Sequence, residues 1–260
     1  MMLLERIAAA GGGNKMEAWQ NWAEQLKAYL DCPCQVIAPQ HDGEALQEMY
    51  ERSRDKGRQE GSTPVWVVVS DTLLEALWNG AGCLGEKDLA AVRRYREQML
   101  KKDIPDGQRF LAERASLLRQ ELEADGADWE ADFLGDSEED SWDELEGIGV
   151  CFAQVPLLLA EIPTDQPWQI PAWLPFGGFQ ECPDNEALMA VARYWYERYG
   201  AVIAAVSYDA LTFLASPIKE AALAEELAIE QFAFNYETVE TIRTLAAKLR
   251  SSTVWDFWWD

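Results

Sequence analysis

The stretch T-V-W-D-F-W-W-D, residues 253–260, places three tryptophans and one phenylalanine among the last eight residues. Chain ends are usually frayed and polar, whereas burying one large apolar side chain is worth roughly 1.5–3 kcal/mol. We therefore expect residues 253–259 to form a final strand or extended arm that closes the core of the second half and tethers the C-terminus.

Upstream, helix and strand signals alternate. The apolar run V-W-V-V-V at residues 65–69 is typical of a strand that is covered on both faces. Residues 201–206 and 210–215 indicate two strands around the hairpin turn Ser207-Tyr208-Asp209. Helical spacing of apolar residues recurs between and around these strands. The alternation predicts an α+β (or α/β) fold, with a mixed β-sheet flanked by helices and closed by the C-terminal aromatic arm.

Three helix starts are predicted from capping signals. Thr72 to Glu75 has the spacing of a capping box. Ser216-Pro217 combines a cap with proline at the first helical position, and that helix is expected to reach about Asn235. Thr238 is expected to cap the last helix.

Four regions are expected from composition and pattern. They are a flexible lead (1–15), an N-terminal α/β region (16–120), an acidic segment (121–147) and a C-terminal α+β domain (148–260). Whether the two folded regions share one sheet is left open.

The net charge is −24, and its distribution is uneven. Lys and Arg are absent between Arg119 and Arg193, and residues 121–146 hold thirteen acids. Such a surface repels nucleic acid and anionic membranes and attracts basic proteins. The competing interpretation is a solvated linker that keeps the protein soluble.

We therefore expect a binding protein with a basic protein partner, of the inhibitor or immunity type that neutralises a toxin. Acids would steer the encounter and aromatic residues would anchor the complex. The candidate partner-binding residues are Trp129, Phe133, Asp136, Glu138, Glu139, Asp140, Trp142, Asp143 and Glu144.

The alternative is an enzyme or a small-ligand-binding protein with an aromatic pocket around residues 176–209. Aromatic walls with a few polar groups are typical of such sites, and tight turns and core packing are the competing explanation. The candidate pocket residues are Phe176, Gly177, Gly178, Cys182, Trp195, Tyr208 and Asp209.

Several catalytic chemistries lack the residues they need. His41 is the only histidine, so a histidine-rich metal site is excluded, and a Ser-His-Asp triad would depend on it. G-A-G-C-L-G at residues 80–85 matches a dinucleotide motif, but an expected helix separates it from the nearest strand. No catalytic residue, metal or cofactor is predicted.

The five cysteines favour a reduced, cytoplasmic protein. They are an odd number, and Cys32-Pro33-Cys34 is C-x-C, not the C-x-x-C of redox or zinc sites. No apolar stretch is long enough to span a bilayer. The oligomeric state is not predicted.

Four motifs in the second half occur together. They are F-G-G-F-Q-E-C-P (176–183), R-Y-W-Y-E-R-Y-G-A (193–201), V-S-Y-D-A-L (206–211) and W-D-F-W-W-D (255–260). This combination, over roughly residues 163–260, resembles an uncharacterised bacterial family, domain of unknown function 4253. The resemblance implies no activity or cofactor. Some acidic bacterial families of similar size are immunity proteins, which is an analogy only.

Overall fold

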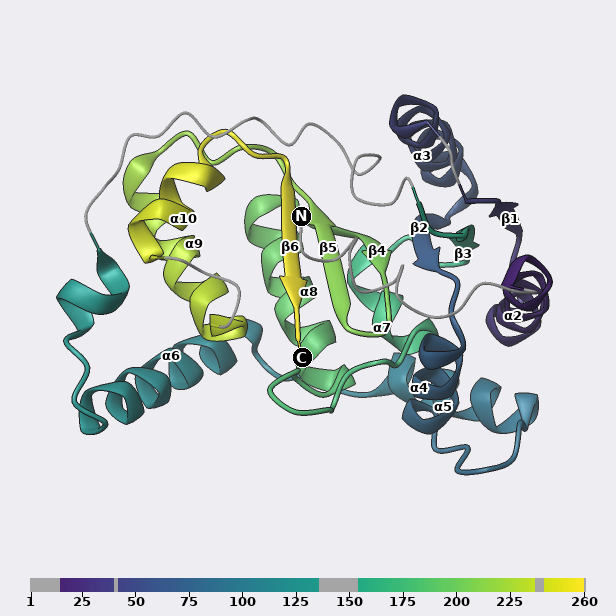
Figure 1. Ribbon diagram of the computed structural model, residues 1–260, viewed down its shortest axis with the longest axis horizontal. Coiled ribbons are helices and arrows are strands. Elements are labelled where there is room, and N and C mark those ends of the chain that lie inside the picture. Colours follow the sequence, from purple (N-terminus) through teal and green to yellow (C-terminus); the bar gives the residue numbers. More distant parts are fainter. Residues whose placement is uncertain (1–14, 40–41, 136–153, 237–240, 260) are drawn as a thin grey trace.

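The computed structural model describes residues 15–39, 42–135, 154–236 and 241–259 (Figure 1). A single six-stranded sheet runs through this part of the chain in the order β1-β3-β2-β4-β5-β6. The strands are β1 (Cys34–Ile37), β2 (Thr63–Val68), β3 (Leu157–Ile162), β4 (Val202–Val206), β5 (Ala210–Leu214) and β6 (Val254–Trp258).

The sheet is mixed, and its topology interleaves the two halves of the sequence. β2 and β4 are parallel, and every other neighbouring pair is antiparallel. β3 lies between β1 and β2, so that Ala160 faces Cys34 on one side and Val65 on the other. The early strands β1 and β2 are therefore not paired with each other. Each of them pairs with β3, which follows much later in the chain.

Helices flank the sheet, as Figure 1 shows. One face packs against a large core to which α2, α4, α7, α8 and α9 contribute, and α3 covers the other face at β2 and β3. All six residues of β2 are buried, as expected for a strand covered on both faces. The expected mixed sheet flanked by helices is confirmed. The helices are α2 (Lys15–Leu30), α3 (Gly43–Glu60), α4 (Asp71–Gly80), α5 (Leu89–Lys101), α6 (Gly107–Ala124), α7 (Ile170–Trp173), α8 (Asn185–Tyr199), α9 (Ala221–Phe234) and α10 (Ile242–Leu249), with short η1 (Trp129–Leu134) and η3 (Pro167–Gln169).

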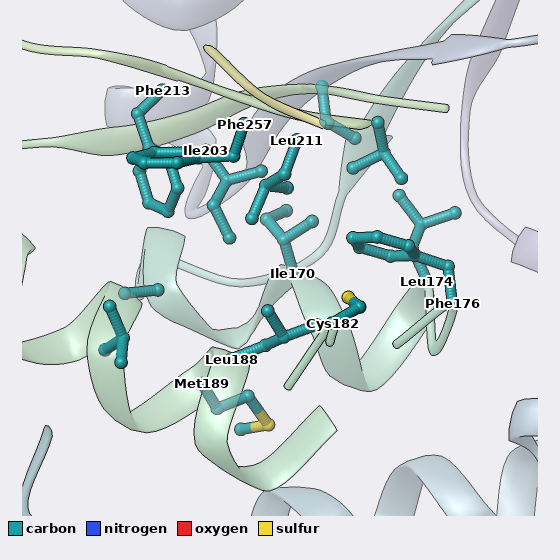
Figure 2. Close-up of a cluster of buried hydrophobic side chains, with 14 of the residues drawn as sticks. Ile170, Leu174, Phe176, Cys182, Leu188, Met189, Ile203, Leu211, Phe213 and Phe257 are labelled. Carbon is teal, nitrogen blue, oxygen red and sulfur yellow. The ribbon is translucent and has the colours of Figure 1, made fainter. Parts of the chain in front are cut away.

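The C-terminal arm is the edge strand β6, and it closes the aromatic core. Trp255, Phe257 and Trp259 alternate toward this core and are buried. The ring of Trp195 in α8 lies 5.7 Å from that of Trp255 and 5.4 Å from that of Phe257. Figure 2 shows Phe257 beside Phe213 and Leu211 of β5, above Leu188 of α8. Successive side chains of a strand point to opposite faces of the sheet, so alternate aromatic residues of this arm can all face the core. This alternation explains why a run so rich in aromatic residues is stable here.

Three predicted helix starts differ from the structure. α4 begins two residues early because Ser70 accepts a hydrogen bond from Leu73 N, in place of a cap at Thr72. α9 begins at Ala221, since Ile218 N donates to Leu249 O and holds the Ser216-Pro217 segment against α10. Thr238 lies outside the described residues, and the cap of α10 is Thr241. The G-A-G-C-L-G segment joins α4 to α5, so no strand precedes it directly.

In the part of the chain that the structure describes, none of the helices combines the length and apolar character needed to cross a membrane.

Candidate functional site

Six exposed carboxylates lie together at the end of α6 and around η1. This acidic face consists of Glu121, Glu123, Asp125, Asp128, Glu130 and Asp132. Residues 120–135 contain no Lys or Arg. The neighbouring cation Arg119 pairs with Glu123 at 2.8 Å and offsets one of the six charges.

Aromatic side chains hold the acidic face on the body of the protein. Trp129 is buried, and its ring lies 5.8 Å from Phe232 of α9 and 5.7 Å from Phe133. The guanidinium of Arg119 covers the Trp129 ring at 5.2 Å. Phe133 is half-buried against the same Phe232 ring at 5.6 Å. Both aromatic candidates that the structure describes therefore pack within the chain.

Backbone contacts fix η1 further. Asp128 caps it by accepting from the backbone N–H groups of Glu130 and Ala131, and Asp132 accepts from Asp128 N at 2.7 Å. At the other end, the Arg243 guanidinium donates to Gly135 O at 2.6 Å. The folded elements α6, α9 and α10 thus hold η1 and present the acidic face (Figure 1).

The remaining candidate partner-binding residues fall outside the described residues. They are Asp136, Glu138, Glu139, Asp140, Trp142, Asp143 and Glu144, and His41 and Cys151 do so as well.

Three of the candidate pocket residues lie in the core. Phe176, Cys182 and Trp195 are buried, and Phe176 packs near Trp259 with ring centroids 6.4 Å apart. Figure 2 shows Phe176 and Cys182 among apolar side chains. Burial raises the pKa of the Cys182 thiol to about 12, which keeps it protonated at neutral pH.

The other four lie in two turns. Gly178 has a φ of 88°, and a Cβ on Gly177 would lie 2.4 Å from Pro183 O, so this turn requires glycine at both positions. Asp209 is buried and bonds within the core, whereas Tyr208 is exposed. Figure 2 shows Phe176 near Cys182, whereas the ring of Trp195 packs against the rings of Phe213, Phe234, Trp255 and Phe257. The ligand-binding alternative stays a prediction.

A polar cluster between α8 and α9 was not predicted. Glu230 accepts hydrogen bonds from Tyr194 Oη at 2.7 Å and Trp195 Nε1 at 3.0 Å, and Tyr199 Oη lies 3.5 Å away. Burial raises the pKa of Glu230, which the bonds from Tyr194 and Trp195 partly offset. The sequence signal that could have revealed it is the single acid in the largely apolar run L-A-I-E-Q-F-A-F at residues 227–234. This arrangement joins two helices through one carboxylate.

Neither of two hollows on the surface of the described residues is lined by the candidate pocket residues. One, of about 50 Å³, lies between α10 and β6 and is lined by Gln231, Ser252 and Trp255 among others. The second, of about 210 Å³, lies beside β1 and is lined by Pro33, Cys34, Gln35, Lys56, Leu159 and Glu161.

Comparison with known proteins identifies one family region. Residues 158–260 match the model of the family described as Domain of unknown function (DUF4253), which confirms the resemblance in the C-terminal part. The match begins within β3 and extends through β6, so it includes four of the six strands. No significant match to the chain was found among curated proteins or among solved structures.

Proposed function

We propose that this protein binds a basic protein, such as a toxin, through its acidic face and acts as its inhibitor or immunity-type partner in the bacterial cytoplasm. The observation that carries the proposal is the six exposed carboxylates on a folded scaffold, with one of them paired to a neighbouring arginine. The net charge of −24 extends the attraction over the whole molecule.

The acidic face is held in a fixed arrangement before any partner binds, which supports this role over that of a solvated linker. Trp129 is buried in the chain's own core, and Asp128 and Arg243 fix both ends of η1. Charges held in place bind an oppositely charged surface without first losing conformational freedom. The aromatic residues therefore shape the acidic face, and the acids make the contact.

The experiment compares two variants of equal charge. Glu121, Asp125 and Glu130 are exposed and make no hydrogen bond or ion pair through their side chains with another described residue. The triple variant Glu121→Gln, Asp125→Asn, Glu130→Gln changes the net charge from −24 to −21. The control variant Glu75→Gln, Glu86→Gln, Asp103→Asn has the same net charge, with its substitutions at exposed positions elsewhere.

Immobilised wild-type protein is used to capture a basic protein from a lysate of its host, and association rates are then measured with the purified partner. At low salt the acidic-face variant should associate about three- to tenfold more slowly than wild type. The control variant should remain within about twofold of wild type, and the difference should shrink at physiological salt, where the screening length is about 8 Å. Equal rates for the two variants would refute the proposal.

A further inference from the structure

The segment Cys32-Pro33-Cys34 brings two thiols together where α2 leads into β1. The two Sγ atoms lie 3.9 Å apart, and both side chains are half-buried. Asp31 ends α2 in the left-handed conformation with a φ of 55°, and β1 begins three residues later at the sheet edge. The other two cysteines among the described residues, Cys83 and Cys182, are buried.

We propose that Cys32 and Cys34 form a thiol–disulfide exchange site whose substrate is the disulfide of a low-molecular-weight thiol. The site lies at the β1 edge of the sheet, at the opposite end of the molecule from the acidic face (Figure 1). It is independent of the proposed partner binding.

The geometry assigns different roles to the two sulfurs. Cys34 lines the hollow of about 210 Å³ beside β1, together with Lys56 and Glu161, whereas Cys32 does not line it. A disulfide entering from solvent therefore reaches Cys34 first. The Sγ of Cys32 lies 3.9 Å from the Sγ of Cys34, so Cys32 is placed to attack the mixed disulfide that results.

The surroundings favour a thiolate at Cys34. As a thiol, its Sγ lies 3.3 Å from Cys32 O and donates to it. When it ionises, the Cys32 thiol donates to it, and this bond lowers the pKa of Cys34 and raises that of Cys32. Lys27 also lowers the pKa of Cys34, while burial and Glu161 oppose the shift. Glu161 is itself neutralised by Lys56 at 2.7 Å.

The exchange proceeds in two balanced steps. The Cys34 thiolate attacks one sulfur of the substrate disulfide, so a mixed disulfide forms and one thiolate leaves. Cys32 then loses its proton and attacks the Cys34 sulfur, which forms the Cys32–Cys34 disulfide and releases the second thiolate. The two protons from the cysteines end on the two released thiols, and the protein dithiol is oxidised by two electrons as the substrate disulfide is reduced.

The short spacing makes this disulfide reversible. The sulfurs must approach from 3.9 Å to about 2.05 Å across a ring that spans only three residues. Strained or exposed disulfides have more oxidising potentials and are the labile, regulatory ones. We therefore expect millimolar reduced glutathione to regenerate the dithiol.

The test uses oxidised glutathione as the substrate, with a chelator present to suppress metal-catalysed oxidation. Wild type, Cys32→Ser and Cys34→Ser are incubated, quenched with acid, alkylated and mapped by mass spectrometry. In wild type, the peptide that contains residues 32 and 34 should lose the mass of two hydrogens and carry no glutathione adduct. Cys32→Ser, whose hydroxyl can still donate to Cys34, should accumulate one glutathione on Cys34. Cys34→Ser should react at residue 32 at least about tenfold more slowly, because Cys32 does not line the hollow and burial also raises the pKa of its thiol.

Three results would overturn the proposal. They are a stable glutathione adduct on wild-type Cys34, equal reaction rates of the two single variants, and no reaction at residues 32 and 34. Circular dichroism before the reaction confirms that each variant is folded, so loss of structure cannot be mistaken for loss of exchange.

Discussion

The indole nitrogen of Trp258 donates to Asp209 Oδ2 at 3.0 Å and so fastens the C-terminal strand to the turn between β4 and β5. Asp209 is buried, and its other oxygen accepts from Ser207 Oγ at 2.7 Å. The backbone adds a second link, since Trp259 N donates to Asp209 O at 2.9 Å. A carboxylate in the middle of the family region thus has a structural partner in the terminal motif.

A double-mutant cycle measures this link. Hydrogen bonds to charged groups contribute about 1.5–3 kcal/mol, so Trp258→Phe and Asp209→Ala should show a coupling of that order in urea denaturation. Trp258→Phe combined with Glu75→Gln, an exposed position on α4, should be additive within about 0.5 kcal/mol. Equal coupling in both cycles would mean that the Trp258–Asp209 bond adds nothing to stability.

The aromatic arm should dominate the stability of the second half. Phe257 is buried and stacks on Trp195 at 5.4 Å, so Phe257→Ala should reduce the free energy of unfolding by about 3–5 kcal/mol. Leu84→Ala is the control because this leucine is 82% exposed, and it should change stability by less than about 0.5 kcal/mol. Deletion of residues 253–260 should abolish cooperative thermal unfolding. Unchanged near-ultraviolet dichroism after the deletion would rule out the closing role.

Trp129 should act as an internal anchor. Trp129→Ala removes a buried ring from between Arg119 and Phe232, and we expect a loss of about 3–5 kcal/mol together with faster proteolysis within residues 125–135. Phe133→Ala, at a half-buried position, should cost less. Wild-type stability and protease resistance in Trp129→Ala would instead leave this side chain available to a partner.

Glu230 should make stability depend on pH. Its pKa is raised in the folded protein by burial, so the folded state binds its proton more tightly than the unfolded state, where the pKa is about 4.3. As pH rises from about 4.3 through the raised pKa, wild type should lose stability relative to Glu230→Gln. Urea denaturation at several pH values measures this difference. A difference that grows in favour of wild type with rising pH would show that the sign is wrong.

Native alkylation should separate the thiols. Cys182, with a pKa raised to about 12 by burial, should react with iodoacetamide far more slowly than Cys34, whose pKa is lowered. Denaturation in urea should remove most of this contrast and serves as the control. Rapid native labelling of Cys182 would argue for an exposed, activated thiol in the turn that follows Gly178.

The fold could be predicted from the sequence where the pattern is local. The apolar run at residues 65–69, the turn at residues 207–209 and the period of two in the terminal arm each specify a strand or a hairpin. The start of α9 could not be predicted, because the bond from Ile218 N to Leu249 O joins residues distant in the sequence.

In the candidate site too, local features could be predicted from the sequence, whereas features that depend on contacts between distant residues could not. The charges of the acidic face can be counted from the sequence, but whether Trp129 faces a partner or Phe232 depends on a contact about a hundred residues away. The Glu230 cluster likewise needs α8 and α9 to be adjacent before its donors converge. The nearness of Cys32 and Cys34 can be seen in the sequence, but the 3.9 Å between their sulfurs depends on side-chain orientations that the sequence does not reveal.

The insertion of β3 between β1 and β2 sets the order of events during synthesis. β2 is complete at Val68, but its neighbours β3 and β4 are finished only at Ile162 and Val206. At the usual translation speed, the run V-W-V-V-V waits roughly 5–30 s after leaving the ribosome tunnel for both partners. An apolar strand with free edges pairs readily with other chains during that interval. Slower translation of residues 70–200 should therefore increase aggregation of nascent chains, and chaperones that bind apolar segments should suppress it.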